Sequence, residues 1–314
     1  MLYWPGMFAN LVRLALVAEA CAWMALWTWL GASLPAALAA TLAGAALLRL
    51  AIVALSFALS FATRSPRSPD EELGPAASLA LLAGEWGAML ANNFLWLPLE
   101  RAILRPDPPA APGGGMPVIV VHGYFSNRGT VRALVRALDR AGAGPVYAPS
   151  LPAVLAPIAT FAAHLGRAVD EVTAATGSRR VILVCHSMGG LCAREYLRTH
   201  GASKVAGIVT VGSPHHGTAL AVLGAGSNAR EMRQGSGFLA GLAAAEGRGA
   251  PCPALSVYTV HDNLVSPQDS SRIGWARNAA IAGVGHLAML ADPRVHRLAT
   301  EEIDRLRAAA GPGG

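Results

Sequence analysis

Two long apolar runs near the N-terminus constrain this chain more than any other feature. They cover residues 14–30 and 36–62, and only the short segment 31–35 separates them. A helix that crosses a bilayer needs about 20 apolar residues, and each run reaches or nearly reaches that length. Four tryptophans supply the interfacial aromatic residues typical of such helices: Trp4, Trp23, Trp27 and Trp29. We therefore expect transmembrane helices at about residues 8–30 and 36–62.

The alternative interpretation of these runs is a secretory signal peptide followed by a buried helix. It fits less well, because no basic segment precedes the first run and the apolar character continues far beyond the length of a signal peptide. The whole chain is also apolar: of 314 residues, 53% are hydrophobic and only 14% are charged. Soluble domains have about 25% charged residues. The composition therefore excludes a disordered or fibrous protein and favours membrane insertion.

The flanking charges predict an orientation. Arg13 precedes the first run, and Arg64 and Arg67 follow the second. By the positive-inside rule, both ends of the hairpin lie in the cytoplasm, which for a bacterial inner membrane places the rest of the chain there too. A third apolar stretch, residues 76–99, contains Glu85, and we expect it to lie on the bilayer as an interfacial helix. If it spans instead, the following domain is periplasmic.

Glu19 and Arg49 lie inside the two predicted spans, where charged residues are candidates for function. At about 1.5 Å per residue, Glu19 lies near the inner end of its helix and Arg49 near the middle of its helix or beyond. We therefore expect no direct ion pair between them. Snorkelling or contact between the helices is the simpler interpretation.

The Pro/Gly-rich segment 105–116 is typical of a linker, so we expect an anchor at residues 1–104 and a second domain at 117–314. The first 113 residues carry six basic and seven acidic groups, and the rest carry nineteen basic and twelve acidic. The excess of basic over acidic groups after residue 113 reflects either genome composition or a basic face near anionic lipids. Because no arginine-rich run is interleaved with aromatic residues, we expect no nucleic-acid partner. The sequence leaves the oligomeric state open.

The four cysteines have no spacing typical of a metal site, so we expect no metal ion and no other cofactor. They are Cys21, Cys185, Cys192 and Cys252.

The second domain alternates short β-branched runs with helical stretches. Strands are expected at 117–121, 145–148, 181–185, 205–211, 255–260 and 279–284, and helices at 129–141, 157–176, 189–200 and 288–309. This alternation predicts an α/β fold with a mainly parallel sheet and helices on both faces.

One turn of this domain carries the chemistry. Ser187 stands between a buried strand and a helix, in the arrangement of a nucleophile elbow, and Gly189 leaves the turn unobstructed. Cys185 occupies a position where glycine is usual. A serine nucleophile needs a base and an orienting acid. His286 follows the last expected strand and Asp262 follows the one before, so both come after the serine in the order that this fold requires.

Two backbone N–H groups are placed to hold an oxyanion. They belong to Met188, at the start of a helix, and to Tyr124, where the chain leaves the first strand. His122 precedes the serine and fits a structural role better than that of a base.

Five motifs, VIVVHGY (118–124), CHSMGG (185–190), GSPHHGT (212–218), HDNLVSP (261–267) and GHLAML (285–290), resemble the α/β-hydrolase superfamily. Within it they are most similar to bacterial triacylglycerol lipases and esterases. The resemblance implies an acyl-enzyme mechanism with Ser187 as nucleophile, His286 as base and acid, and Asp262 as the orienting residue. It also implies oxyanion donors at Tyr124 and Met188. The family's calcium-binding aspartates have no clear match here.

Residues 219–250 form an insertion that acts as a short cap in lipase-like enzymes. Phe238, Leu239 and Leu242 are candidates to line an acyl pocket, although a plainly packed helix explains them equally well. We therefore expect a membrane-anchored serine hydrolase that cleaves esters, with lipids or other apolar esters as substrates. The alternatives are an acyltransferase or thioesterase on the same fold, or an inactive membrane-bound binding protein.

Overall fold

The computed structural model describes residues 6–108, 115–151, 154–247 and 249–311. Its centre is one parallel sheet of six strands in the order β2-β1-β3-β4-β5-β6. The strands are β1 (Val118–Val121), β2 (Val146–Tyr147), β3 (Val181–His186), β4 (Val205–Val211), β5 (Ala254–Thr259) and β6 (Arg277–Ile281). The four central strands are buried at every residue, because both faces of the sheet are covered. The predicted α/β class is confirmed.

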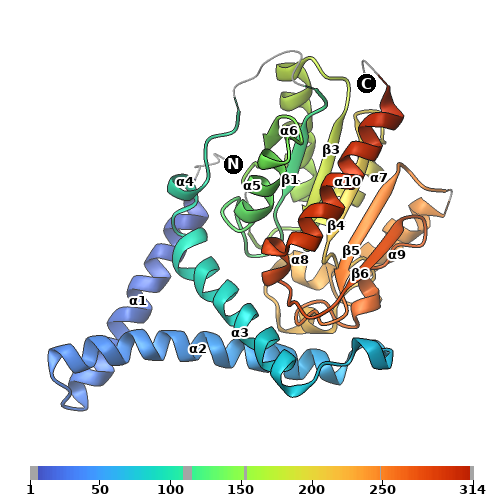
Figure 1. Ribbon diagram of the computed structural model, residues 1–314. Helices are drawn as coiled ribbons and strands as arrows, with labels where there is room; N and C mark the ends of the chain where they lie inside the picture. The colour runs from blue at the N-terminus through green and yellow to red at the C-terminus, as the bar shows by residue number, and fades with distance from the viewer. Residues whose placement is uncertain (1–5, 109–114, 152–153, 248, 312–314) are drawn as a thin grey trace.

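Helices cover the two faces of the sheet separately (Figure 1). Helices α5 (Arg132–Arg140) and α10 (Pro293–Ala310) share one apolar core with the sheet. Helices α6 (Ile158–Thr176) and α7 (Met188–His200) share the other core. Parallel strands end at the same edge of the sheet, so the loops after β3, β5 and β6 come together there.

The insertion between β4 and β5 is mostly helical. It holds the 3₁₀ turn η3 (Ala219–Leu223), α8 (Gly226–Glu231) and α9 (Gly237–Glu246). Helix α9 packs against α7, and its Leu239 and Leu242 belong to the core cluster on that side of the sheet. The part nearer β4, residues 219–232, instead approaches the loop edge.

Three helices precede the sheet: α1 (Met7–Trp29), α2 (Leu34–Ala62) and α3 (Pro75–Ala91). Among the described residues, α1 and α2 are the helices long and apolar enough to cross a bilayer, with 0% and 17% of their most apolar windows buried. Core helices are mostly buried, so this exposure argues against a core role. Helix α3 has 17 residues, and the π-helical turn at residues 92–96 continues it directly.

Short elements complete the N-terminal part. A 3₁₀ turn, η1 (Pro69–Glu71), separates α2 from α3, and the π-helical turn η2 (Asn92–Trp96) and helix α4 (Glu100–Ile103) follow α3. Figure 1 shows α1, α2 and α3 outside the two helical layers of the sheet. Of the predicted linker, residues 109–114 lie outside the described part of the chain.

Arg49 and Glu19 form a direct ion pair, so the expectation that they stay apart is wrong. Arg49 Nη2 donates to Glu19 Oε2 at 2.7 Å, and Arg49 Nη1 binds the other carboxylate oxygen. A helical side chain points back toward the N-terminus of its own helix. Arg49 accordingly reaches back to the level of Ala45, whose carbonyl it also contacts at 3.4 Å. This reach along the helix axis brings its guanidinium to Glu19.

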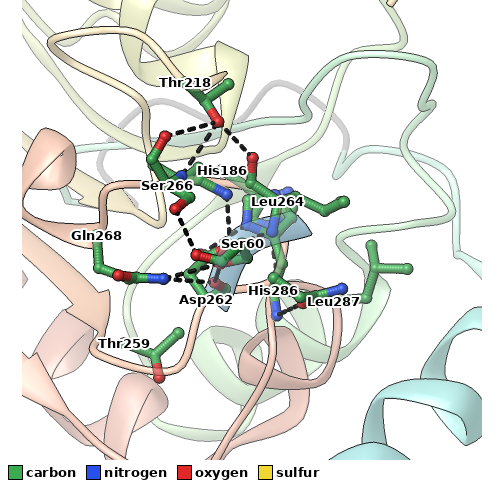
Figure 2. Close-up of polar contacts among 12 residues, drawn as sticks. Ser60, His186, Thr218, Thr259, Asp262, Leu264, Ser266, Gln268, His286 and Leu287 are labelled. Carbon is green, nitrogen blue, oxygen red and sulfur yellow. Dashed lines mark hydrogen bonds and ion pairs between the residues drawn. The ribbon is translucent and has the colours of Figure 1, made fainter. Parts of the chain in front are cut away.

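The C-terminal half of α2 is hydrogen-bonded to the loop that follows β5. Ser60 Oγ donates to the carbonyl of Asp262 at 2.6 Å, and Thr63 contacts Ser266 at 2.7 Å. Gln268 joins both sides, because its Nε2 donates to Ser60 Oγ and to the Asp262 carbonyl while its Oε1 accepts from the N–H of Ser65. Figure 2 shows Ser60, Gln268 and Asp262 converging in this way. We call these contacts the polar seam.

The polar seam makes a stability prediction. Gln268→Ala removes three hydrogen bonds and leaves buried partners unpaired, so we expect a loss of about 2–4 kcal/mol in the free energy of unfolding. Gln234 is exposed, so Gln234→Ala serves as the matched control and should change stability by less than about 0.5 kcal/mol. Chemical denaturation in detergent micelles measures both. Equal stabilities for the two variants would contradict a structural role for the seam.

Candidate active site

Ser187 occupies a strained turn between β3 and α7. Its backbone dihedrals are φ 55° and ψ −128°, a region that residues with a side chain rarely adopt. The turn is crowded on both sides. A Cβ added at Gly123 would lie 2.7 Å from Ser187 Cβ, and one added at Gly189 would lie 2.8 Å from the carbonyl oxygen of Val121. Glycine at these two positions therefore lets the turn close.

Cys185, which stands where glycine is usual, fits the turn because it belongs to β3 and packs into the buried core. Burial raises the pKa of its thiol well above the ordinary value, so the cysteine stays neutral. It acts here as a small apolar residue.

Asp262 and His286 are in contact at the loop edge. His286 Nδ1 lies 2.8 Å from Asp262 Oδ2, and both side chains are almost completely buried. The other carboxylate oxygen, Oδ1, accepts the N–H groups of Leu264 at 2.8 Å and Val265 at 2.7 Å. These bonds fix the carboxylate so that one oxygen faces the imidazole. Asp262 therefore sets the orientation of the His286 ring.

Electrostatics favours protonation of His286. Burial lowers the pKa of the imidazole, but the charge and hydrogen bond of Asp262, together with the charge of Glu85, outweigh burial and raise the pKa above its ordinary 6.5. His186 lies against the same ring, with the centroids 4.8 Å apart (Figure 2). Burial and the charge of His286 lower the pKa of His186 well below the ordinary value, so His186 stays neutral beside the base.

Ser187 and His286 line one cavity of about 250 Å³. Its wall comes from the loop after β1, the insertion, the loop after β5 and the end of α3. Apolar side chains dominate the insertion's share of the wall, which is made by Leu220, Ala221, Gly224, Ala229 and Met232. The cavity is therefore an apolar chamber with Ser187 and His286 on its wall.

The two predicted oxyanion donors lie beside the nucleophile. Met188 is the first residue of α7, so its N–H has no acceptor within the helix and the helix dipole favours an anion there. Tyr124 lines the cavity, and its hydroxyl both donates to the carbonyl of Ala225 at 2.8 Å and accepts from the N–H of Ala225 at 2.9 Å. These bonds tie the loop after β1 to the insertion.

The predicted acyl-pocket residues lie elsewhere. Leu239 and Leu242 are buried in the core cluster beside α7, and Phe238 packs against that cluster. None of the three is among the described residues that line the cavity. Apolar residues of α9 thus pack into the core cluster, and the earlier part of the insertion lines this cavity.

His122 has the structural role expected of it. Its Nε2 accepts the N–H of Leu151 at 2.9 Å, so the ring is neutral, and burial lowers the pKa of His122 to about 4. Within the described ranges, no cluster of three or more His, Cys, Asp or Glu side chains is placed to hold a metal ion.

Sequence reasoning missed several residues that support the site. Asn263 Oδ1 accepts the N–H of His286 at 3.0 Å, and its Nδ2 donates to Ser56 of α2 at 2.8 Å. Glu85 of α3 bonds to the loop just after His286. The one available signal was Glu85 itself, an acid in an otherwise apolar stretch. Serines in α2 give no signal, because serine is common in helices of every kind.

Comparison with known proteins agrees with this architecture. Residues 116–235 match the family model described as the alpha/beta hydrolase fold. Together with the six-stranded parallel sheet, this match shows that the chain carries an α/β-hydrolase domain.

Solved structures of similar fold include two lipases. Lipase B from Aspergillus fumigatus aligns with a TM-score of 0.56 and 21% identity, over 65% of this chain and 56% of that one. The mature form of lipase BlEst2 from Bacillus licheniformis aligns with a TM-score of 0.55 and 18% identity, over 63% of this chain and 96% of that one. This chain thus spans little more than half of lipase B. At these identities the likeness establishes the fold.

The geometry predicts how His286 responds to the loss of its partner. Asp262→Asn removes the charge that favours the imidazolium, so we expect the pKa of His286 to fall by about one unit or more. An NMR titration of ¹⁵N-labelled imidazoles in detergent micelles measures this, with His286→Gln used to assign the signal. A His286 pKa unchanged by Asp262→Asn would contradict the pairing.

Proposed function

We propose that this protein is a membrane-anchored serine hydrolase that cleaves carboxylic esters, with acyl lipids as its substrates. One observation carries the proposal: Ser187, on its strained turn, shares an apolar cavity with a histidine already bound to a buried aspartate. A nucleophile, a base and an orienting acid in these relations suit acyl transfer.

In the proposed reaction, Ser187 Oγ attacks the ester carbonyl while Nε2 of His286 accepts its proton. Asp262 stabilises the imidazolium that forms, and the N–H groups of Tyr124 and Met188 hold the oxyanion. His286 then protonates the departing alcohol, which leaves the acyl group on Ser187. A water molecule, deprotonated by His286, attacks the acyl-enzyme and releases the carboxylic acid. As the bond between the acyl group and Ser187 Oγ breaks, His286 passes the proton taken from water to Ser187 Oγ. The free enzyme is thus restored, and the original serine proton has left with the alcohol.

The apolar wall of the cavity supports an acyl substrate. Small and apolar side chains of η3 and α8 face the same space as Ser187, and an acyl chain gains about 0.8 kcal/mol per CH₂ that it buries. Apolar side chains are also exposed nearby, among them Phe125, Leu155, Val222 and Leu223. A lipid surface is the environment that accommodates such a rim.

The exposed surfaces of α1 and α2 support anchoring. Large apolar side chains on both helices are solvent-exposed, including Leu14, Trp29, Leu42 and Leu55. The bidentate pair of Arg49 and Glu19 lets two charges share one apolar environment. The charge pattern favours the cytoplasmic side of a bacterial inner membrane for the hydrolase domain. Phe8 of α1 stacks edge-on against Phe125, with the centroids 5.6 Å apart.

The nucleophile assignment is tested by Ser187→Ala. We expect the wild type to react with a fluorophosphonate probe and to hydrolyse p-nitrophenyl esters in detergent, and the variant to lose labelling and at least roughly 10³-fold in kcat. Ser203 is exposed, so Ser203→Ala is the matched control and should retain both properties. Labelling that persists in Ser187→Ala would contradict the assignment.

The cavity wall predicts chain-length selectivity. Ala221 lines the cavity and is buried, so Ala221→Phe should fill part of the chamber. We expect kcat/KM for long-chain esters to fall roughly tenfold or more relative to short-chain esters. Ala240 lies exposed on α9, and Ala240→Phe should leave the profile of the wild type unchanged. An identical chain-length profile in Ala221→Phe would show that the acyl chain binds elsewhere.

A further inference from the structure

Glu85 is a fully buried acid whose partners lie more than 200 residues away in the sequence. It projects from α3, and its side chain accepts the N–H of Leu287 at 2.9 and 3.1 Å and the N–H of Ala288 at 2.9 Å. These are the first two residues after His286. The carboxylate therefore holds the loop at the point where the base is attached.

The hydrogen bonds indicate an ionised carboxylate. Both oxygens of Glu85 act as acceptors of backbone N–H groups, so a proton on either oxygen would compete with these bonds. Burial is the largest influence on the pKa of Glu85 and, together with the charge of Asp262, raises it above the ordinary value. The N–H groups of Leu287 and Ala288 and the charge of His286 oppose this rise without cancelling it. Among the described residues, no lysine or arginine forms an ion pair with Glu85. A buried charge without a cation is costly, so its hydrogen bonds must offset that cost.

The loop is shaped to admit this carboxylate. A Cβ added at Gly285 would lie 2.5 Å from Glu85 Oε2, so a larger residue before His286 would push the acid away. The charged and titratable groups around Glu85 are His286 and Asp262, and His186 packs on the other side of the His286 ring. His286 is thus placed between two carboxylates: Asp262 binds its ring, and Glu85 binds the backbone N–H groups of the two residues that follow it.

The loop that carries Asp262 is also bonded to a helix that precedes the sheet. Ser60 of α2 donates to the carbonyl of Asp262, and Ser56 of α2 binds Asn263, which accepts the N–H of His286 (Ser60 and Asp262 are drawn in Figure 2). The loop of the acid and the loop of the base are therefore both bonded to helices that precede the hydrolase domain.

We propose that Glu85 is a positioning residue for His286, and that through Glu85 and the polar seam the N-terminal helices form part of the active site. This inference rests on the proposed function, in which His286 is the base. Glu85 acts in two ways: its hydrogen bonds fix the backbone of Leu287 and Ala288, and its negative charge favours the imidazolium that forms when Ser187 attacks.

The test compares Glu85→Gln with wild type, using the full-length chain in detergent micelles. The substitution keeps the shape of the side chain and removes its charge. We expect kcat for p-nitrophenyl esters to fall roughly tenfold or more with little change in KM, because a displaced base slows the chemical step. Without the negative charge the imidazolium is less favoured. The acidic limb of the pH profile, and the pKa of His286 measured by NMR, should therefore shift to lower pH.

Two further variants make the result decisive. Asp70 is an exposed acid outside the site, so Asp70→Asn controls for a general loss of charge and should match wild type. Glu85→Asp keeps the charge but shortens the reach, so the NMR pKa of His286 should stay near that of wild type while kcat falls. Glu85→Asp also tests the positioning role if Glu85→Gln does not fold.

The outcomes separate the two proposals. An unchanged pKa of His286 in Glu85→Gln, or an unchanged kcat in Glu85→Asp, would overturn the positioning role. A lower melting temperature in Glu85→Gln with neither a pH shift nor a change in kcat would also overturn it, because it would show a purely structural role. Absence of ester hydrolysis in the wild type would contradict the proposed function, whereas the NMR shift would still report on the contact between Glu85 and the His286 loop.

Discussion

The hydrogen bond between Asp262 and His286 depends on two loops that the sheet supports at only one end. Strands β5 and β6 fix where these loops begin, but beyond that point each loop carries buried polar groups that need partners. Those partners come from α2 and α3. Ser56 and Ser60 bind groups of the Asp262 loop, and Glu85 binds the two N–H groups after His286. The arrangement of Asp262 and His286 thus also depends on helices outside the sheet.

Helix α2 combines two kinds of surface. Large apolar side chains are exposed along it from Leu38 to Phe61, and its last turns also present Ser56 and Ser60 to the hydrolase domain. Helix α3 is joined to α2 by a hydrogen bond from Trp86 to the carbonyl of Ala46 at 2.9 Å. The proposed anchor and the hydrolase domain are consequently joined by buried polar contacts between segments that lie far apart in the sequence.

Local patterns made much of the fold predictable. The run 205–211 is β4 to the residue, and the segment around Ser187 forms the expected strand, turn and helix, because β-branched runs and turn glycines act within a few residues. The ion pair of Arg49 with Glu19 was not predictable from counting residues, since it depends on which way a side chain leans. The contacts of Glu85 and Ser60 join positions about 200 apart, and such contacts leave no periodic trace. The sequence could not tell whether Leu242 packs in the core or lines a pocket, because apolar spacing predicts burial and does not identify the neighbours; the structure places it in the core cluster beside α7.

The serines of α2 also fix the rotation of that helix. Each residue of an α-helix turns the chain by about 100° and advances it by about 1.5 Å, so Arg49 and Ser60 keep a fixed angle to each other around the axis. Glu19 fixes the direction of Arg49, and Asp262 fixes the direction of Ser60. Adding or deleting one residue of α2 between these two contacts would rotate either Arg49 or Ser60 away from its partner. The number of residues between Arg49 and Ser60 is therefore constrained by the helical repeat, and an apolar segment of another length would not replace this part of α2.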